Sequence, residues 1–403
     1  MIKSVHIKNF KSLVDLKLDL GTFNVLIGEN GCGKSNILEG LAFGAAASAD
    51  KLDYEFLGSR GIRVTNPEFM TSAFSNARKK KSIEINFTTS ERTYEFDLVN
   101  DSSNPKKWIN RNKDIAFKEI NRLMTSLFLE DDEKKRKKAL DELKEDGEQL
   151  KAISEILKPF KNENDYKEFF SNLYPKIIEK AFSSNEISNF IIYSPEQSSL
   201  RKFEETTQIY PLGIKGEGMF QYLKELAFDK KNKKTLSDIR QNLMLLDWYD
   251  SFELPENLLK NEFALKIKDK YLNPSLQFFD QRSTNEGFLY LLFYSTLFIS
   301  KTTPSFFAID NLDSSFNPKL CMQLTKNLSS LTKKQKEQVI VTTQNPAILD
   351  GLNLKDESQR LFVVSRNEMG HTRVERIHYN EKRSMRLSEI WTKGFIGGLP
   401  ENF

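Results

Sequence analysis

The stretch Gly28-Glu29-Asn30-Gly31-Cys32-Gly33-Lys34-Ser35 decides the fold, because it matches the spacing G-x-x-x-x-G-K-[ST] at every position. The residues before it, 23–27 (Phe-Asn-Val-Leu-Ile), form a short apolar run with the character of a buried parallel strand. The residues after it, 36–41 (Asn-Ile-Leu-Glu-Gly-Leu), open a helix. The sequence therefore predicts a strand, a phosphate-binding loop and a helix in this order.

The chemistry of this loop follows from its residue types. Gly28, Gly31 and Gly33 let the backbone turn tightly enough to aim N–H groups at phosphate oxygens, and the helix N-terminus adds a partial positive charge. Lys34 supplies a point charge, and the Ser35 hydroxyl is expected to ligate Mg²⁺. The other residues that we expect to line this site are Glu29, Asn30, Cys32 and Asn36.

The composition of the chain sets its outer bounds. The 403 residues are 39% hydrophobic and 29% charged, which suffices for one large core or two smaller ones, and we expect two lobes. No run of eighteen apolar residues exists and residues 1–7 have the pattern of an amphipathic strand, so we expect a cytoplasmic protein with no membrane partner. Cys32 and Cys321 are the only cysteines, too few for a disulfide framework or a zinc site. Cys32 itself fits either a redox switch or a tolerated small side chain.

The net charge of +4 is not the footprint of a dedicated nucleic-acid binder. The basic runs 78–81 (Arg-Lys-Lys-Lys) and 230–234 (Lys-Lys-Asn-Lys-Lys) still leave DNA open as a partner, with solvated loops as the alternative. The charge-dense stretch 130–138 fits a solvated helix face or a contact with an acidic partner.

Three regions differ in their hydrophobic pattern. Residues 16–20 alternate as a half-buried strand, and residues 83–87 and 94–98 alternate as an antiparallel hairpin. From about residue 105 to 185 the sequence is rich in lysine and glutamate with helical spacing, which indicates a helical insertion. Heptads are not sustained over three or four repeats, so the insertion is not expected to be a long coiled coil.

The remainder of the chain adds acidic and polar candidates at strand ends. Residues 190–193 form a buried strand, after which Glu196 and Gln197 are candidates for holding Mg²⁺ or the attacking water. The glycine-rich stretch 213–218 fits a helix cap or a ligand contact. Residues 305–310 form an apolar strand that ends in Asp310, where a phosphate-loop NTPase places its metal-side aspartate.

Five segments together resemble ABC-type ATPases of the RecF, SMC and OLD group. Residues 311–318 are similar to the segment that carries the catalytic glutamate and the D-loop. Residues 283–287, which precede the helix 288–299, resemble a degenerate ABC signature. The strand 339–346 ends where the family places its switch residue. The opening 7–12 and the loop continuation 34–39 add to this resemblance. Within the group, the shape is similar to stand-alone ATP-binding proteins of prokaryotic anti-phage systems, such as the Septu and PARIS ATPase subunits. The resemblance covers residues 1–100 and 190–403.

The resemblance implies an α/β fold: an ABC-type P-loop NTPase core with an antiparallel β lobe at the N-terminal side and a helical insertion. It divides the chain into 1–104, the insertion 105–189, and 190–403. The implied cofactors are ATP and Mg²⁺, with Lys11 beside the phosphate loop. It further implies that Asn285, Glu286 and Gly287 contact the ATP of a second copy in a head-to-tail dimer.

The sequence departs from the family pattern at two catalytic positions. Asn311 stands where the family places a glutamate base, and Gln344 stands where it places a histidine switch. An amide accepts no proton from water, so we expect slow hydrolysis unless Asp313 substitutes. After Asp313 the sequence offers a strand pair, one short helix and a tail, so we do not expect the nuclease domain of the OLD type.

These features lead to one hypothesis and two alternatives. We expect a sensor or scaffold subunit of an anti-phage defence complex, which binds ATP and controls a separately encoded effector such as a nuclease. The first alternative is a RecF-like DNA repair ATPase with salt-sensitive DNA binding. The second is a nucleotide-locked scaffold with negligible turnover.

Overall fold

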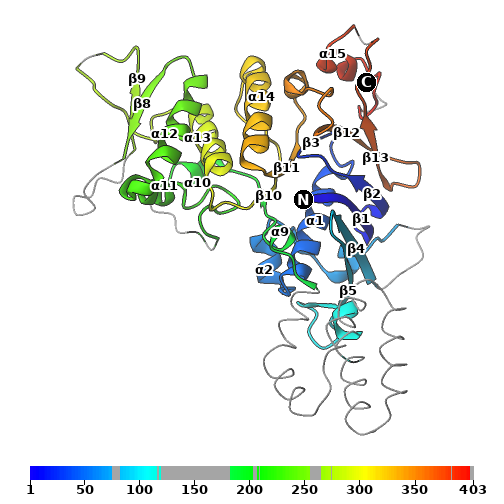
Figure 1. Cartoon of the computed structure of the whole chain (residues 1–403). Helices are drawn as coiled ribbons and strands as arrows, with labels where there is room; N and C mark the ends of the chain where they lie inside the picture. Colours follow the sequence, from blue (N-terminus) through cyan, green and yellow to red (C-terminus); the bar gives the residue numbers. More distant parts are fainter. Residues whose placement is uncertain are drawn as a thin grey trace, which may run out of the picture.

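The computed structural model describes residues 1–74, 82–115, 118, 182–202, 207, 209–254, 265–273, 275–382 and 384–399. In this part of the chain, two larger sheets and a small hairpin are combined with helices. Figure 1 shows the helices α10 to α13 together with the hairpin on one side of the molecule, and the N-terminal strands on the other.

The strands are β1 (Ile2–Phe10), β2 (Leu13–Asp19), β3 (Phe23–Ile27), β4 (Ser82–Thr89), β5 (Thr93–Asn100), β6 (Trp108–Asn110), β7 (Ile192–Tyr193), β8 (Tyr249–Glu253), β9 (Lys266–Asp269), β10 (Phe306–Ile309), β11 (Gln338–Thr342), β12 (Gln359–Arg366) and β13 (Thr372–Ile377). The helices are α1 (Lys34–Ser48), α2 (Tyr54–Ser59), α3 (Pro67–Met70), α9 (Asn185–Ser188), α10 (Gln197–Leu200), α11 (Met219–Phe228), α12 (Lys233–Asn242), α13 (Glu286–Ile299), α14 (Pro318–Gln335) and α15 (Leu387–Thr392). Short 3-10 turns are η2 (Lys230–Asn232), η3 (Leu243–Leu245) and η4 (Pro346–Gly351).

The central sheet has the strand order β13-β12-β3-β11-β10-β7. Strands β12, β3, β11, β10 and β7 run parallel, and β13 pairs antiparallel with β12 at one edge. Every residue of β3, β10 and β11 is buried, as expected for a parallel sheet covered on both faces. The carboxyl ends of β3, β10 and β11 meet at one edge, so the segments that follow them form a common site.

Alternate residues of the parallel strands enter different cores. Val25, Ile309 and Val341 face a core built with α11 to α14, whereas Leu26 and Ile340 face a core built with α1 and the N-terminal sheet. A two-residue period places successive side chains on opposite faces, which explains this division. The parallel sheet therefore lies between two layers.

The second sheet is antiparallel, with the order β2-β1-β4-β5-β6. Helix α1 packs closely against it, because a Cβ on Gly40 would approach Ile7 within 2.9 Å and one on Gly44 would approach Phe87 within 2.4 Å. The predicted hairpin is confirmed as β4 and β5. Strand β6 pairs with β5, so this sheet continues beyond residue 104.

The expected α/β architecture with an antiparallel N-terminal sheet is confirmed. The expected helices at 219–227 and 288–299 correspond to α11 and α13, and the basic run 230–234 forms η2 and the start of α12. Residues 119–181 of the predicted insertion and the basic run 78–81 lie outside the described residues. Of the helices that the structure describes, none has both the length and the apolar character needed to cross a bilayer.

Candidate functional site

The phosphate loop connects β3 to α1 in the predicted order. Gly28 and Gly33 adopt positive φ angles of 148° and 113°. Neither position has room for a side chain: a Cβ on Gly28 would lie 2.2 Å from the Val364 carbonyl oxygen, and one on Gly33 would lie 2.1 Å from the Thr372 hydroxyl. The loop is thus held from outside by β12 and β13, and glycine is required at both positions.

Lys34 is folded back into this loop. Its Nζ donates to the carbonyl oxygens of Gly28 (2.6 Å) and Glu29 (2.9 Å), and the residue is only 7% exposed. An ammonium group with two backbone acceptors at the N-terminus of α1 can exchange them for phosphate oxygens. Burial raises the pKa of the neighbouring Cys32 thiol, so this cysteine resists forming the thiolate that a redox switch needs.

The carboxylate of Asp310 lies at the end of β10 and joins the loop to the rest of the sheet. Ser35 Oγ donates to Asp310 Oδ2 at 2.9 Å, and Thr342 Oγ1, at the end of β11, donates to Oδ1. The Thr342 hydroxyl also accepts from the Asn311 N–H at 2.9 Å. The structure therefore brings Ser35 and Asp310 together as the sequence predicts, and it adds Thr342, which the sequence analysis missed.

The positions expected to act in hydrolysis follow Asp310 and Thr342. Asn311 is exposed and has a left-handed backbone with φ of 60°. Asp313 Oδ1 accepts from the Thr343 hydroxyl at 2.6 Å and from the Gln344 N–H at 3.4 Å. The Gln344 side chain donates to Asn30 Oδ1 of the phosphate loop at 2.6 Å, so the switch position and the loop are in direct contact.

A charged network borders the start of α1. The Lys11 ammonium and the Arg63 guanidinium both bind the carboxylate of Glu39, which is 2% exposed. Burial lowers the pKa of Lys11, and the charge of Glu39 opposes this shift. Arg63 also donates to Asn36 Oδ1 at 3.3 Å. The structure directs the Lys11 ammonium to Glu39 of α1, and a contact of Lys11 with the nucleotide stays a prediction.

Arg63 was missed in the sequence analysis, because it belongs to no motif. The residue follows α2 by a few positions, and only the packing of that segment against α1 brings its guanidinium to Asn36. A basic residue shortly after the first helix of a phosphate-loop unit is a weak signal, since charged surface residues are frequent in any sequence.

The signature-like residues lie at the start of α13. Asn285 is its N-cap, accepting from the Phe288 N–H at 2.9 Å, and Glu286 accepts from the Ser315 hydroxyl at 2.8 Å. With Gly287 they line a cavity of about 550 Å³ whose other lining residues come from 245–248 and 315–323. The described lining of that cavity includes no phosphate-loop residue.

Gln197 begins α10, after the strand β7 that pairs with β10 through Tyr193 and Ile309. Glu196 forms an ion pair with Lys215 at 3.0 Å. The carboxylate of Asp310 is bonded to Ser35 and Thr342 rather than to Gln197. The metal role of Gln197 stays a prediction.

These features define a class of protein. A glycine loop between a buried strand and a helix, a loop lysine at the helix start, and a serine bonded to a strand-end aspartate are the parts of a P-loop nucleotide-binding ATPase.

The comparison with protein families then identifies the group. Residues 23–350 match the family described as "AAA domain, putative AbiEii toxin, Type IV TA system", and the chain belongs to this family.

A solved structure shows the same fold. The chain is similar to a crystal structure of an SMC head bound to the C-terminal winged-helix domain of ScpA, with 16% sequence identity and a TM-score of 0.50 over 94% of this chain and 98% of that one. The SMC head domain of Thermotoga maritima matches with 13% identity and a TM-score of 0.45 over 94% of this chain and 99% of that one. An uncharacterised protein of Methanocaldococcus jannaschii is 51% identical over 43 residues, which is 10% of this chain and 20% of that protein. The fold is that of an SMC-type ABC ATPase head.

Proposed function

We propose that this protein is the ATP-binding sensor or scaffold subunit of a prokaryotic anti-phage defence complex, acting in the cytoplasm and controlling a separately encoded effector such as a nuclease. The assignment of nucleotide binding rests on one observation: Lys34, Ser35 and Asp310 lie together at the same edge of the central sheet. The family description, which names the AbiEii toxin, supports the defence part.

The donor set at this edge fits Mg²⁺. The Ser35 hydroxyl and one Asp310 oxygen lie 2.9 Å apart, and hard cations of this kind prefer oxygen ligands. We assign Ser35 and Asp310 to the metal, Lys34 to the phosphates, and Thr342 to fixing the orientation of Asp310. A bound Mg²⁺ would neutralise charge on the phosphate oxygens. Arg63, close to the N-terminus of α1 through its contact with Asn36, adds a positive charge to the same region.

Dimerisation around ATP is the second part of the proposal. The N-terminus of α13 carries a partial positive charge. The cavity that Asn285, Glu286 and Gly287 line there has no phosphate-loop residue in its described lining. A head-to-tail pair would place Asn285, Glu286 and Gly287 of one copy against the nucleotide of the other. ATP then holds the two copies together.

Slow turnover is the third part. Asn311 follows Asp310 directly and carries an amide, which accepts no proton from water. Asp313 is the substitute base that we propose, because two hydrogen bonds to its Oδ1 fix the carboxylate beside Gln344. A head that holds ATP for long periods suits a sensor that waits for a trigger. The division of the chain at 104 and 189, with the insertion as a docking surface for the effector, remains part of this proposal.

The experiment compares the parent protein with Lys34→Ala. Light scattering with and without Mg-ATP should show an ATP-dependent dimer for the parent alone, and phage protection in cells should require both Lys34 and a neighbouring gene. The proposal of a separate effector would be refuted by phage protection that survives deletion of every neighbouring gene. Plasmid cleavage by the purified chain with Mg²⁺ or Mn²⁺ would refute it as well, because this polypeptide would then be the effector.

The same preparation separates the alternatives. Turnover stimulated by DNA, with binding that weakens steeply as salt increases, would support the RecF-like repair ATPase instead. An ATP-dependent dimer with no measurable turnover, even in the presence of the neighbouring protein, would support the nucleotide-locked scaffold.

A further inference from the structure

We propose that a second cavity, remote from the phosphate loop, binds a small phosphorylated molecule of nucleotide size. This cavity has a volume of about 1040 Å³ and is lined from α2, from the segment before β7 and from residues 301–305 before β10. It lies at the amino ends of β7 and β10, whereas the phosphate loop and Asp310 lie at the carboxyl ends of the same sheet. The two sites are therefore separate.

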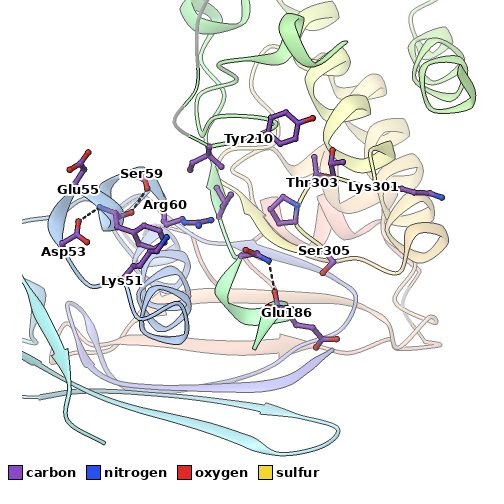
Figure 2. A pocket seen from close by; sticks show the side chains of 17 residues that line it. Lys51, Asp53, Glu55, Ser59, Arg60, Glu186, Tyr210, Lys301, Thr303 and Ser305 are labelled. Atoms are coloured by element: carbon purple, nitrogen blue, oxygen red, sulfur yellow. Dashed lines mark hydrogen bonds between the residues drawn. The ribbon is translucent and has the colours of Figure 1, made fainter. Parts of the chain in front are cut away.

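Arg60 is the group that indicates an anionic ligand. Its Nε is buried and has no hydrogen-bond partner among the described residues. Its guanidinium lies 4.7 Å from the centre of the Phe56 ring, and Lys51 Nζ lies 5.3 Å from the same ring. Figure 2 shows Arg60 directed toward the middle of the cavity. Arg60 as a whole is only partly buried, but its buried Nε–H has lost water without gaining an acceptor, and an anion placed in the cavity would supply one.

The acidic residues of the cavity do not neutralise Arg60. The Asp53 carboxylate caps α2 by accepting from the Phe56 N–H, and Glu186 forms an ion pair with the N-terminal amino group. Glu55 is exposed and directed away from the middle of the cavity in Figure 2. Burial lowers the pKa of Arg60, which agrees with a guanidinium whose charge is poorly compensated.

Tyr210 defines the size and type of the ligand. It lies opposite Lys51 and Arg60 in Figure 2, is 64% exposed, and is held by a 3.0 Å hydrogen bond from its hydroxyl to Glu225. A fixed, exposed aromatic face above a cationic wall suits a ligand with a phosphate at one end and a flat ring at the other. The volume of about 1040 Å³ is at the upper end of the range of small-molecule sites. We therefore infer a mononucleotide-like ligand rather than DNA.

Calorimetry on the full chain tests this inference. The protein carries Lys34→Ala to suppress binding at the phosphate loop, and the probes are inorganic pyrophosphate and AMP. Both should bind, and Arg60→Gln should weaken both by about tenfold or more, the effect of removing a charge-assisted contact. Tyr210→Ala should weaken AMP and leave pyrophosphate unchanged. Arg111→Gln, which removes an exposed arginine paired with Asp97 outside the cavity, is the matched control and should change neither.

The outcomes are decisive in both directions. Absence of binding at millimolar probe, or equal binding by Arg60→Gln, overturns the proposal. Binding of a 5′-phosphorylated oligonucleotide without binding of AMP overturns the small-molecule assignment in favour of nucleic acid. Should Arg60→Gln fail to fold in a thermal-unfolding control, Lys51→Gln takes its place with the same expected direction, and equal binding by that variant overturns the proposal. Because every protein in this series carries Lys34→Ala, which impairs the phosphate loop, these results are independent of the function proposed above.

Discussion

The replacement Asn311→Glu introduces a glutamate directly after Asp310, where the resemblance to ABC-type ATPases implies a catalytic base. Asn311 is exposed, and its N–H is bonded to the Thr342 hydroxyl, a contact that the backbone of any residue except proline keeps. The change therefore adds a carboxylate next to Asp310 and keeps this hydrogen bond. If the position belongs to the general base, turnover should rise by about tenfold or more, which corresponds to about 1.4 kcal/mol of activation free energy.

The same replacement should lower stability. The backbone of Asn311 has φ of 60°, a region that asparagine tolerates and that costs most other residues roughly 1–2 kcal/mol. Asn311→Glu should therefore reduce the free energy of unfolding by about 1 kcal/mol while it raises the rate. Asn311→Gln is the matched control, because it carries the same backbone cost and a similar length without a base. It should lose the same stability and gain no rate.

The assay is steady-state phosphate release at saturating Mg-ATP, run with calorimetry to establish that each variant still binds the nucleotide. Denaturant unfolding supplies the stability readout. A variant Asn311→Glu that binds Mg-ATP but turns over at or below the parent rate refutes the assignment of position 311. Asp313, held by Thr343, would then be the first candidate for the base, and Asp313→Asn should lower the residual rate.

Three further predictions concern single side chains. Lys34→Ala should weaken Mg-ATP binding by about 1.5–3 kcal/mol in calorimetry, because a charge-assisted phosphate contact is lost, and binding equal to the parent would contradict the central site. Thr342→Val should reduce the dependence of ATP affinity on Mg²⁺, because the hydroxyl that fixes the orientation of Asp310 is removed. The affinity for ATP without Mg²⁺ should be unchanged. If Mg²⁺ raises the ATP affinity of the variant as much as that of the parent, Thr342 does not position Asp310. Glu337 is 4% exposed and burial raises its pKa from 4.5 to about 9, so the folded state keeps a proton that the unfolded state releases. The free energy of unfolding should therefore fall as pH rises from about 4.5 to about 9, and Glu337→Gln should raise the melting temperature more at pH 8 than at pH 5; a gain independent of pH would contradict this origin.

The phosphate-loop unit was predictable because it is contained in one continuous stretch. The run 23–27, the glycines and Lys34 all lie within a few residues of one another, and their structure depends mainly on local sterics and on burial of the strand. Asp310 was predictable for a related reason, since an apolar run that ends in an acid indicates a buried strand with a polar end. The alternating residues of β4 and β5 gave the hairpin in the same way.

The residues that complete the site were not predictable from local sequence. Thr342 contacts Asp310 only because β10 and β11 pair in parallel with Ile309 opposite Val341. That register is a property of the whole sheet, and a threonine at the end of a strand carries no signal of its own. Arg63 contacts Asn36 because the segment after α2 packs against α1. The ion pair of Lys11 with Glu39 likewise depends on tertiary packing and has no signal in the local sequence.

The strand β3 has consequences for how the chain is made. Its two neighbours in the sheet are β11 and β12, and the nearer one begins about 300 residues after β3 ends. At roughly 5–20 residues per second, a ribosome needs about 15–60 s to supply β11 after β3 has been synthesised. During that interval the apolar run of β3 has neither of its pairing partners, and such non-local pairing is slow to form. The nucleotide-binding edge is consequently among the last parts to assemble on a nascent chain, and a prematurely terminated product would expose β3 to aggregation and to chaperones.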